Sequence, residues 1–430
     1  MNHRMLKTKM KAWLILAVLL PGWAAAQSVE EYQQMAAANN PELRASFQQY
    51  LGSLEEGAQT GAMPDPEIAF AWFINPIETR LGPQQARISL TQMFPWFGTL
   101  DSRRAISDME ARARFEVFQE KRNRLFYQTE ETLLELYELD RSIELAEENL
   151  LILNSLVEIS LRRYETNQAS QVDVLRAQIE QEDLQTQLAL LKDNRVVLIQ
   201  KFNELLNRAD DMEVTVPDTL DWDTPIESQI ELEARLARQN PELNRLRYRE
   251  GSVREKKRLA VKDSKPSFGV GLDYIVTGER ENMPSLNNNG RDAIVARARF
   301  RIPLFRKKYS AKIQQANRNA QSVQSSIVAR ENKLKTELKA SLRDFYDATR
   351  KFELYDQKQI QRVQQALNIM TQVYSSDSSN FEEILRMQRK FLSYQLSRIQ
   401  ALTKMKDSAA YIDYLTGVHN ITPDTITPAK

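Results

Sequence analysis

The pattern of hydrophobic and polar positions divides the chain into two kinds of segment. Two long runs, 99–216 and 304–416, contain neither glycine nor proline and are rich in leucine, alanine and charged residues. Because glycine and proline interrupt helices most strongly, both runs are predicted to be helical. Each is too long for one globular helix, so we expect each to turn back once and form a helical hairpin, over 98–207 and 304–416.

The hydrophobic periodicity lapses into polar residues once in each run, which predicts hairpin tips near 165–172 and 375–382. The two polar clusters align without a gap at an offset of 210 positions. Asn167 and Asp377 occupy equivalent positions, and these residue types tolerate the left-handed backbone conformation that often ends a helix. The alignment indicates two copies of one hairpin.

Shorter segments in which apolar and polar residues alternate precede each hairpin, and this alternation predicts strands with one apolar face. They form one pair in each copy, at 67–74 and 86–94 and at 267–276 and 292–302. The helix start Asn-Pro-Glu-Leu precedes each pair, at 40–43 and 240–243. The predicted organisation is a signal sequence, a first repeat, a connector, a second repeat and a tail, over 1–26, 27–207, 208–239, 240–417 and 418–430.

A basic segment, an apolar stretch over 12–20 and the small residues 24–26 open the chain, which is the pattern of a cleaved secretory signal. The alternative is an N-terminal membrane anchor, but the stretch is shorter than the roughly 20 residues that a spanning helix needs. The chain has no cysteine, which excludes disulfides, thiol catalysis and a lipidated cysteine. We therefore expect an exported protein without a lipid anchor.

Charge and residue types argue against a nucleic-acid-binding protein and against an enzyme. Lys+Arg number 59 and Asp+Glu 58, so the chain has no net field to attract nucleic acid. Removal of the signal would leave one histidine, His419, which by itself suits neither a catalytic triad nor a metal cluster. We expect no enzyme activity, no metal and no cofactor.

The predicted strands are too few to cross a membrane alone. Four strands cannot close a barrel, and the open edges of a sheet cannot stay unpaired in lipid. Since membrane-spanning barrels begin at about eight strands, several copies must each contribute four, and three copies would give twelve. The alternative is a small soluble sheet packed on the helices. A helix over 98–167 would extend roughly 100 Å, much longer than a compact domain, and needs coiled-coil partners.

These features together resemble the TolC-like outer membrane efflux proteins. The resemblance rests on the duplicated unit of strand pair and hairpin, the Asn-Pro-Glu-Leu starts, the prolines after the second strands, Pro95 and Pro303, and the tip sequences at 173–178 and 383–388. It implies a mainly α homotrimer in which a twelve-stranded membrane β-barrel, four strands per chain, continues into a long α-helical coiled-coil barrel. Asn167 and Asp377 depart from the glycine common at such tips.

The resemblance implies a passive exit duct in the outer membrane of a Gram-negative bacterium. Its expected partners are two further copies of itself, a periplasmic membrane-fusion adaptor, an inner-membrane pump of the resistance-nodulation-division or ABC type, and outer membrane lipid. Segment 92–98 is similar to members associated with heavy-metal or cation efflux, while drug efflux and type I secretion stay open. The rival from another class is a periplasmic coiled-coil adaptor or scaffold without a pore, which would have one hairpin within a lipoyl-like β-domain.

The resemblance also places the periplasmic entrance at the tips, lined by acidic rings and held shut by links between helices. The candidates for the rings are Asp173, Asp377, Glu382 and Glu383, and those for the links are Tyr164, Arg176, Tyr374 and Arg386. The alternative for Asp173 and Glu383 is that they only cap the returning helices.

Two more sets of residues follow from the strands. The candidates for the barrel lumen, hydrated or paired with Glu67 and Asp273, are Arg87, Arg297, Arg299 and Arg301. The candidates for an aromatic belt at the membrane interface are Trp72, Phe94 and Trp96. For Trp96 and its neighbour Phe97, packing at the junction of barrel and helices is the alternative.

Overall fold

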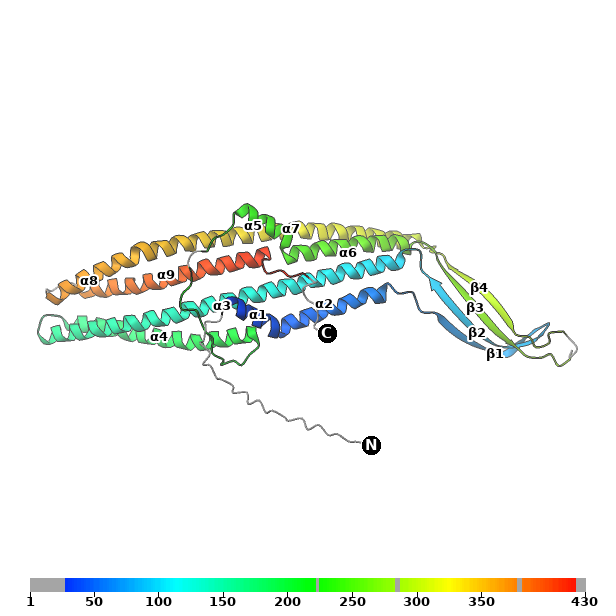
Figure 1. Ribbon diagram of the computed structural model, residues 1–430, viewed down its shortest axis with the longest axis horizontal. Helices are drawn as coiled ribbons and strands as arrows, with labels where there is room; N and C mark the ends of the chain where they lie inside the picture. The colour runs from blue at the N-terminus through cyan, green and yellow to red at the C-terminus, as the bar shows by residue number, and fades with distance from the viewer. Residues whose placement is uncertain (1–27, 222–223, 283–286, 377–380, 423–430) are drawn as a thin grey trace, which may run out of the picture.

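The computed structural model describes residues 28–221, 224–282, 287–376 and 381–422. The chain is elongated, with the helices lying lengthwise and one sheet projecting from the end of the helical body (Figure 1). The elements of the first half are α1 (Val29–Asn39), α2 (Pro41–Thr60), β1 (Glu67–Thr79), β2 (Gly82–Phe94), α3 (Thr99–Glu165) and α4 (Gln171–Leu206). Those of the second half are α5 (Gln229–Gln239), α6 (Pro241–Asp263), β3 (Ser267–Thr277), β4 (Ala293–Arg301), α7 (Arg306–Leu354), a π-helix (Tyr355–Gln359), α8 (Ile360–Ser376) and α9 (Phe381–Thr416). The predicted fold of long helices with four strands is confirmed.

The four strands form one antiparallel sheet in the order β1-β2-β3-β4. The central pairing of β2 with β3 joins the two halves of the chain and sets Leu90 opposite Leu272. The first two strands are longer than the sequence pattern indicated, because a register irregularity between Trp72 and Ile77 lets β1 continue past Pro76. An edge strand tolerates proline, which has no N–H to donate.

The outgoing helices of the two hairpins differ. α3 is one unbroken helix of 67 residues, roughly 100 Å long at 1.5 Å per residue. The equivalent helix of the second half is interrupted by the π-helix, which widens one turn and which the sequence did not predict. There the Tyr355 ring lies 5.3 Å from that of Tyr394, and Asp356 pairs with Arg398 at 3.1 Å.

Equivalent asparagines cap the short helices in the same way. Asn40 and Asn240 each accept a hydrogen bond from the backbone N–H three residues on, at 3.0 and 3.1 Å. The side-chain amide of Asn40 also donates to the carbonyl of Leu205 at 3.1 Å, and that of Asn240 to Leu415 at 2.9 Å. Each cap therefore ties a short helix to the end of a returning long helix.

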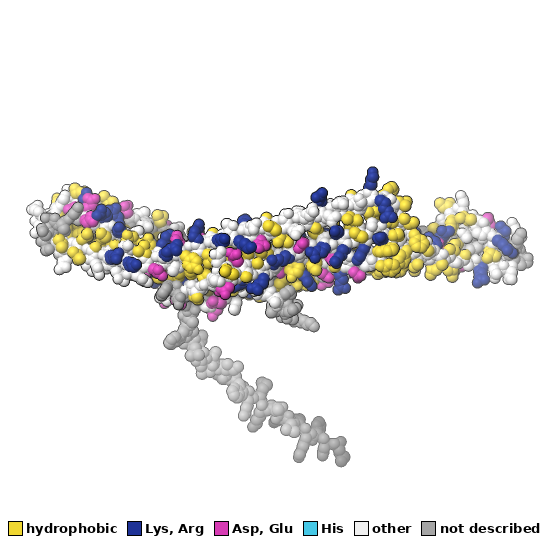
Figure 2. Space-filling model, turned by 90° about the horizontal axis from the view of Figure 1, so that it is seen from above, with side chains coloured by type: hydrophobic (Ala, Val, Ile, Leu, Met, Phe, Trp, Pro, Cys, Tyr) yellow, Lys and Arg dark blue, Asp and Glu magenta, His cyan; other side chains and the backbone are white. Residues whose placement is uncertain are grey.

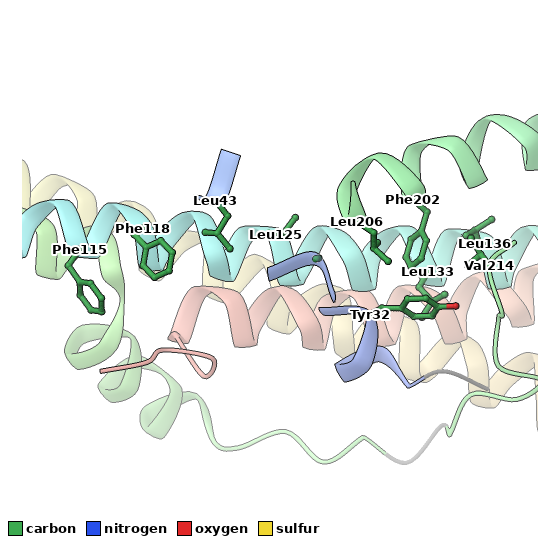
Figure 3. Close-up of a cluster of buried hydrophobic side chains, with 11 residues drawn as sticks. Tyr32, Leu43, Phe115, Phe118, Leu125, Leu133, Leu136, Phe202, Leu206 and Val214 are labelled. Carbon is green, nitrogen blue, oxygen red and sulfur yellow. The ribbon is translucent and has the colours of Figure 1, made fainter. Parts of the chain in front are cut away.

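Hydrophobic clusters follow one another along the helical body. The first gathers where α1 meets α3 and α4, and there Tyr32 packs edge-on against Phe202 with ring centroids 4.9 Å apart (Figure 3). A second joins α5 and α6 to α7 and α9 around Leu236 and Leu338. A third, at the hairpin turns, joins both hairpins through Leu153, Ile384 and their neighbours.

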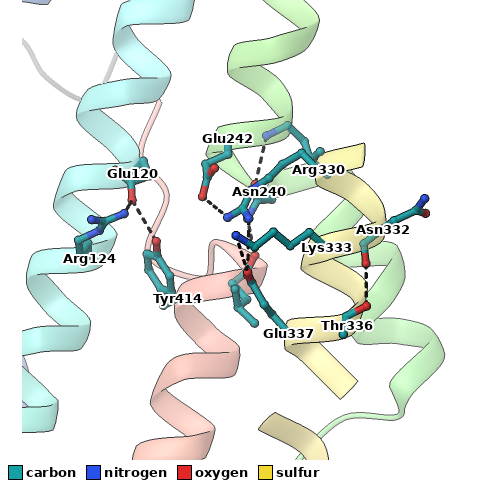
Figure 4. Close-up of polar contacts among 12 residues, drawn as sticks. Glu120, Arg124, Asn240, Glu242, Arg330, Asn332, Lys333, Thr336, Glu337 and Tyr414 are labelled. Carbon is teal, nitrogen blue, oxygen red and sulfur yellow. Dashed lines mark hydrogen bonds and ion pairs between the residues drawn. The ribbon is translucent and has the colours of Figure 1, made fainter. Parts of the chain in front are cut away.

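Polar contacts also hold helices of the second half together and connect the two halves. Arg330 of α7 pairs with Glu242 of α6 at 2.5 Å, and the Tyr414 hydroxyl of α9 donates to Glu120 of α3 at 3.0 Å (Figure 4). Residues after α9 return to α3, where the Gln119 amide donates to the carbonyl of Ile421 at 2.6 Å. The two hairpins are thus fastened along their length, and the sheet lies beyond them.

Candidate functional site

The helix ends that flank the hairpin turns, those of α3 and α4 and of α8 and α9, lie at the end of the molecule opposite the sheet (Figure 1). In the first turn Asn167 has a φ of 59°, which confirms the predicted left-handed residue. Ser170 caps α4, because its hydroxyl accepts a hydrogen bond from the backbone N–H of Val172 at 3.2 Å. Asp173 lies beyond the cap, 3.9 Å from Arg176 on the same helix. Its carboxylate is therefore not needed as the cap.

Ion pairs cross between the two hairpins near the tips, one of them from Arg389 of α9 to Glu180 of α4 at 3.5 Å. Arg176 of α4 lies 3.2 Å from Glu382 in the first turn of α9. Glu383 instead pairs with Arg386 on its own helix. Asp377, the remaining carboxylate that the sequence placed here, is outside the described residues. Among the predicted link residues, Arg176 therefore joins hairpins while Arg386 does not.

The two aligned tyrosines have different surroundings. Tyr374 is 3% exposed, its ring lies 5.0 Å from that of Phe381, and the Arg163 guanidinium lies 4.5 Å above it. Burial and, secondly, the charge of Asp173 raise the pKa of the Tyr374 phenol. Tyr164 is 42% exposed. Arg163 was not predicted, and the aligned position of the second copy holds an apolar residue, so no repeated signal marks it.

The predicted lumen residues lie on the face of the sheet opposite its apolar side chains. Arg297 pairs with Asp273 at 2.5 Å, one of the two partners that the sequence suggested. The Arg87 guanidinium lies 5.7 Å from the centre of the Phe73 ring. Arg299 on β4 is exposed.

Aromatic side chains gather where the sheet meets the helices. Phe94 stacks on Phe268 at 5.5 Å, Phe97 contacts the same ring at 5.9 Å, and Trp96 packs edge-on against Phe97 at 5.8 Å. Figure 2 shows hydrophobic side chains collected at this junction. Trp96 and Phe97 thus both pack here, while Phe97 stays 73% exposed.

Trp72 lies elsewhere on the same apolar face and is 75% exposed. Its register partner on β2, Ala86, is roughly 27 Å along that strand from Phe94, at about 3.4 Å per residue. An apolar band of about 25 Å flanked by aromatic residues is typical of the outer surface of membrane barrels. The separation of Trp72 and Phe94 along the sheet is therefore similar to the height of such a band, and exposed Ile74 and Ile77 lie beyond Trp72.

In the part of the chain that the structure describes, no three His, Cys, Asp or Glu residues come together in a way that could hold a metal ion. None of the helices there has an apolar stretch of the length needed to cross a bilayer.

No protein-family model and no curated protein matches this sequence. Solved structures do match. The outer membrane protein VceC of Vibrio cholerae aligns with a TM-score of 0.74 and 14% identity over 90% of this chain and 96% of VceC. CusC, whose structures describe folding and transmembrane channel formation, aligns with a TM-score of 0.78 and 13% identity over 91% of this chain and 92% of CusC.

The outer membrane channel CmeC of Campylobacter jejuni aligns with a TM-score of 0.72 and 13% identity over 97% of this chain and 94% of CmeC. These alignments cover nearly all of both chains in each case. The chain therefore has the fold of these outer membrane channels, as the resemblance in its sequence implied.

Proposed function

We propose that the chain is one subunit of a homotrimeric exit duct in the outer membrane. Each subunit contributes four strands to a twelve-stranded β-barrel and two hairpins to a helical tube that extends into the periplasm. The signal sequence predicted at 1–26 would direct export, and the absence of cysteine leaves no lipid anchor of the cysteine type.

The open sheet carries this proposal. β1 and β4 are its edges, and apolar side chains along β1 are 62–90% exposed, namely Ile68, Phe70, Trp72 and Ile74. In water such a strand is a site for aggregation, and in lipid each unpaired edge group costs several kcal/mol. Pairing β4 of one subunit with β1 of the next satisfies both edges and turns the apolar face to lipid.

The structure gives reasons to prefer this function to its rivals. Among the described elements no helix packs on either face of the sheet, whereas the soluble alternative needs one covered face (Figure 1). An adaptor with a single hairpin does not fit two hairpins that each follow a strand pair. Efflux, with a periplasmic adaptor and an inner-membrane pump as partners, is our first assignment because the sequence resembles outer membrane efflux proteins and the chain has the fold of the channels CusC and CmeC. Type I secretion uses the same architecture and is the second.

In this function the tips form the periplasmic entrance. Three-fold repetition would concentrate Asp173, Asp377, Glu382 and Glu383 around a narrow opening, where rings of carboxylates attract cations. Arg176 pairs with Glu382 across the hairpins there, and the buried Tyr374 ring packs beneath Arg163 of the first hairpin.

The test is to purify the mature chain from outer membranes and to measure its mass and conductance. We expect a trimer that requires detergent and forms pores in planar bilayers. A monomer that stays soluble without detergent would instead support the periplasmic scaffold.

A further inference from the structure

The polar face of the sheet carries an excess of positive charge. Its ionisable residues in register along the four strands are the arginines Arg87, Arg297, Arg299 and Arg301 and the carboxylates Glu67 and Asp273. Asp273 is engaged by Arg297 at 2.5 Å. The second repeat therefore contributes two arginines, Arg299 and Arg301, that Asp273 does not neutralise.

Small residues leave these arginine side chains uncovered. Gly269 of β3 is the register partner of Arg299, and Ser267 is that of Arg301. A Cβ at Gly269 would lie 2.4 Å from the sulfur of Met93 and 3.0 Å from the carbonyl oxygen of Gln92, so a larger residue there would require neighbouring atoms to shift. The guanidinium groups consequently project from a part of the sheet where the opposite strand has little or no side chain.

A hollow of about 430 Å³ continues this positive surface to the start of the helices. Four of its five strand residues belong to the polar face, so it opens to the same side as Arg299. Its basic residues come from α3, α6, α7, β4 and the loop between α6 and β3, and they are Arg103, Lys262, Lys265, Arg301, Lys308 and Lys312. Its carboxylates are Glu67 and Asp263.

Most of this charge is not used within the chain. The Lys262 ammonium donates to the carbonyl of Gly98 at 2.7 Å and to Ser102 at 2.8 Å, and Lys312 pairs with Asp263 at 3.0 Å. The other four basic residues have no carboxylate oxygen within 4.0 Å among the residues that the structure describes, and these are Arg103, Lys265, Arg301 and Lys308. We call these four the basic throat.

We propose that the basic throat forms a site for anionic solutes where the barrel meets the helices, opposite in charge to the acidic tips. The inference rests on the proposed trimeric duct, in which three copies of the basic throat would surround the passage where the barrel meets the helical tube. Rings of arginine and lysine are the usual device of pores for anions and phosphates, and their field is strongest within a narrow, low-dielectric wall. This assignment runs against the cation efflux suggested by segment 92–98.

The experiment compares two triple variants of the full-length trimer in planar bilayers. The first, Lys265→Gln/Arg301→Gln/Lys308→Gln, removes three charges of the basic throat. The control, Arg104→Gln/Arg306→Gln/Lys307→Gln, removes three charges at sequence neighbours that do not line the hollow. Inorganic triphosphate is added on the barrel side, so that it reaches the basic throat without passing the tips, and salt is kept near 0.1 M to limit screening to about 10 Å.

We expect triphosphate to block the wild-type channel and to block the first variant about tenfold less well, with the chloride-to-potassium permeability ratio lowered about twofold or more. The control should behave as the wild type does. The anion assignment is wrong if both variants form conducting trimers that keep the block and selectivity of the wild type. It is also wrong if both variants lose them equally. Either result leaves the proposed duct intact. Preparations of wild-type protein that neither form trimers nor conduct would overturn the proposed function itself.

Discussion

The strand pairs of the two repeats, β1 with β2 and β3 with β4, are alike on one face of the sheet and different on the other. Both outer faces are apolar and exposed, as at Leu90 and Leu272. The inner face of the first pair has one arginine and one carboxylate, whereas β4 alone carries three arginines. Every strand of a membrane barrel must present apolar side chains to lipid, whereas the side chains that face the lumen can differ with the solutes that pass. In the proposed duct, the two repeats would therefore be equivalent toward lipid and specialised toward the lumen.

The hairpins show a similar division. α3 is continuous, while its counterpart contains the π-helix Tyr355–Gln359, and π-helical turns are frequent at functional sites. The first tip exposes Tyr164, while the second buries Tyr374 beneath Arg163. The second hairpin therefore has the tighter contacts at the tip and the irregular turn behind it.

The largest expected effect tests whether the repeats are equivalent toward lipid. Leu90→Arg and Leu272→Arg each place a charge on the apolar face, at positions that are register partners. A charge near the middle of the bilayer costs about 2–4 kcal/mol per subunit, and a trimer contains three. Both variants should lose detergent-extractable trimer to the same degree, as measured by native mass or light scattering.

Ala69→Arg is the control, because Ala69 lies on the polar face of β1 and is exposed. It should assemble as the wild type does. Normal assembly of either leucine variant would show that its side chain does not face lipid, and loss of only one would show that the repeats are not equivalent there.

A second prediction concerns a difference between the outgoing helices. Burial raises the pKa of Glu116 and of Glu130 on α3 to about 7, whereas the hydrogen bond from Arg350 holds the pKa of Asp347 on α7 below its usual value. The folded chain therefore binds the glutamate protons more tightly than the unfolded chain does. The contribution of these two protonated glutamates to folding stability is fully present below about pH 4.5. It is lost as the pH rises through about 7.

Glu116→Gln/Glu130→Gln should consequently raise the apparent melting temperature of the trimer at pH 8 and leave it nearly unchanged at pH 4.5. The gain at pH 8 should be about 1–3 kcal/mol for each residue. Asp347→Asn is the control from the other repeat and should give no such gain at pH 8. An equal change at both pH values would show that the glutamates are not protonated in the folded chain.

The fold was predictable because it depends on local pattern. Runs without glycine or proline predicted the long helices, and alternation predicted the strands, since helix and strand periods follow from backbone geometry alone. The length of β1 was not predictable, because its continuation past Pro76 depends on pairing with β2. The π-helix is likewise set by contacts with α9 through Tyr394 and Arg398.

The candidate site was predictable in part for the same reason. Alignment of the repeats identified Asn167 as a residue that could take the left-handed conformation, and it has a φ of 59°. The alignment could not show that Tyr374 is buried and Tyr164 exposed, because aligned residues of two copies pack against different neighbours. Nor could it find Arg163, whose role depends on the ring of Tyr374 from the other hairpin.

The smallest expected effect concerns an ion pair between the two hairpins at the tips. Arg176→Ala removes one ion pair between α4 and α9 and leaves that of Glu180 with Arg389, whereas Arg386→Ala removes a pair within α9 only. Both removed pairs are solvent-exposed, so each contributes roughly 0.2–1 kcal/mol, and loss of the first should raise resting conductance by at most about fivefold. Arg386→Ala should conduct as the wild type does, and Arg176→Lys should restore most of the closure. Because exposed charges are screened, the difference between the alanine variants should shrink in 1 M salt. If Arg386→Ala leaks as much as Arg176→Ala, the entrance is held shut by the fold of each hairpin rather than by the contact between them.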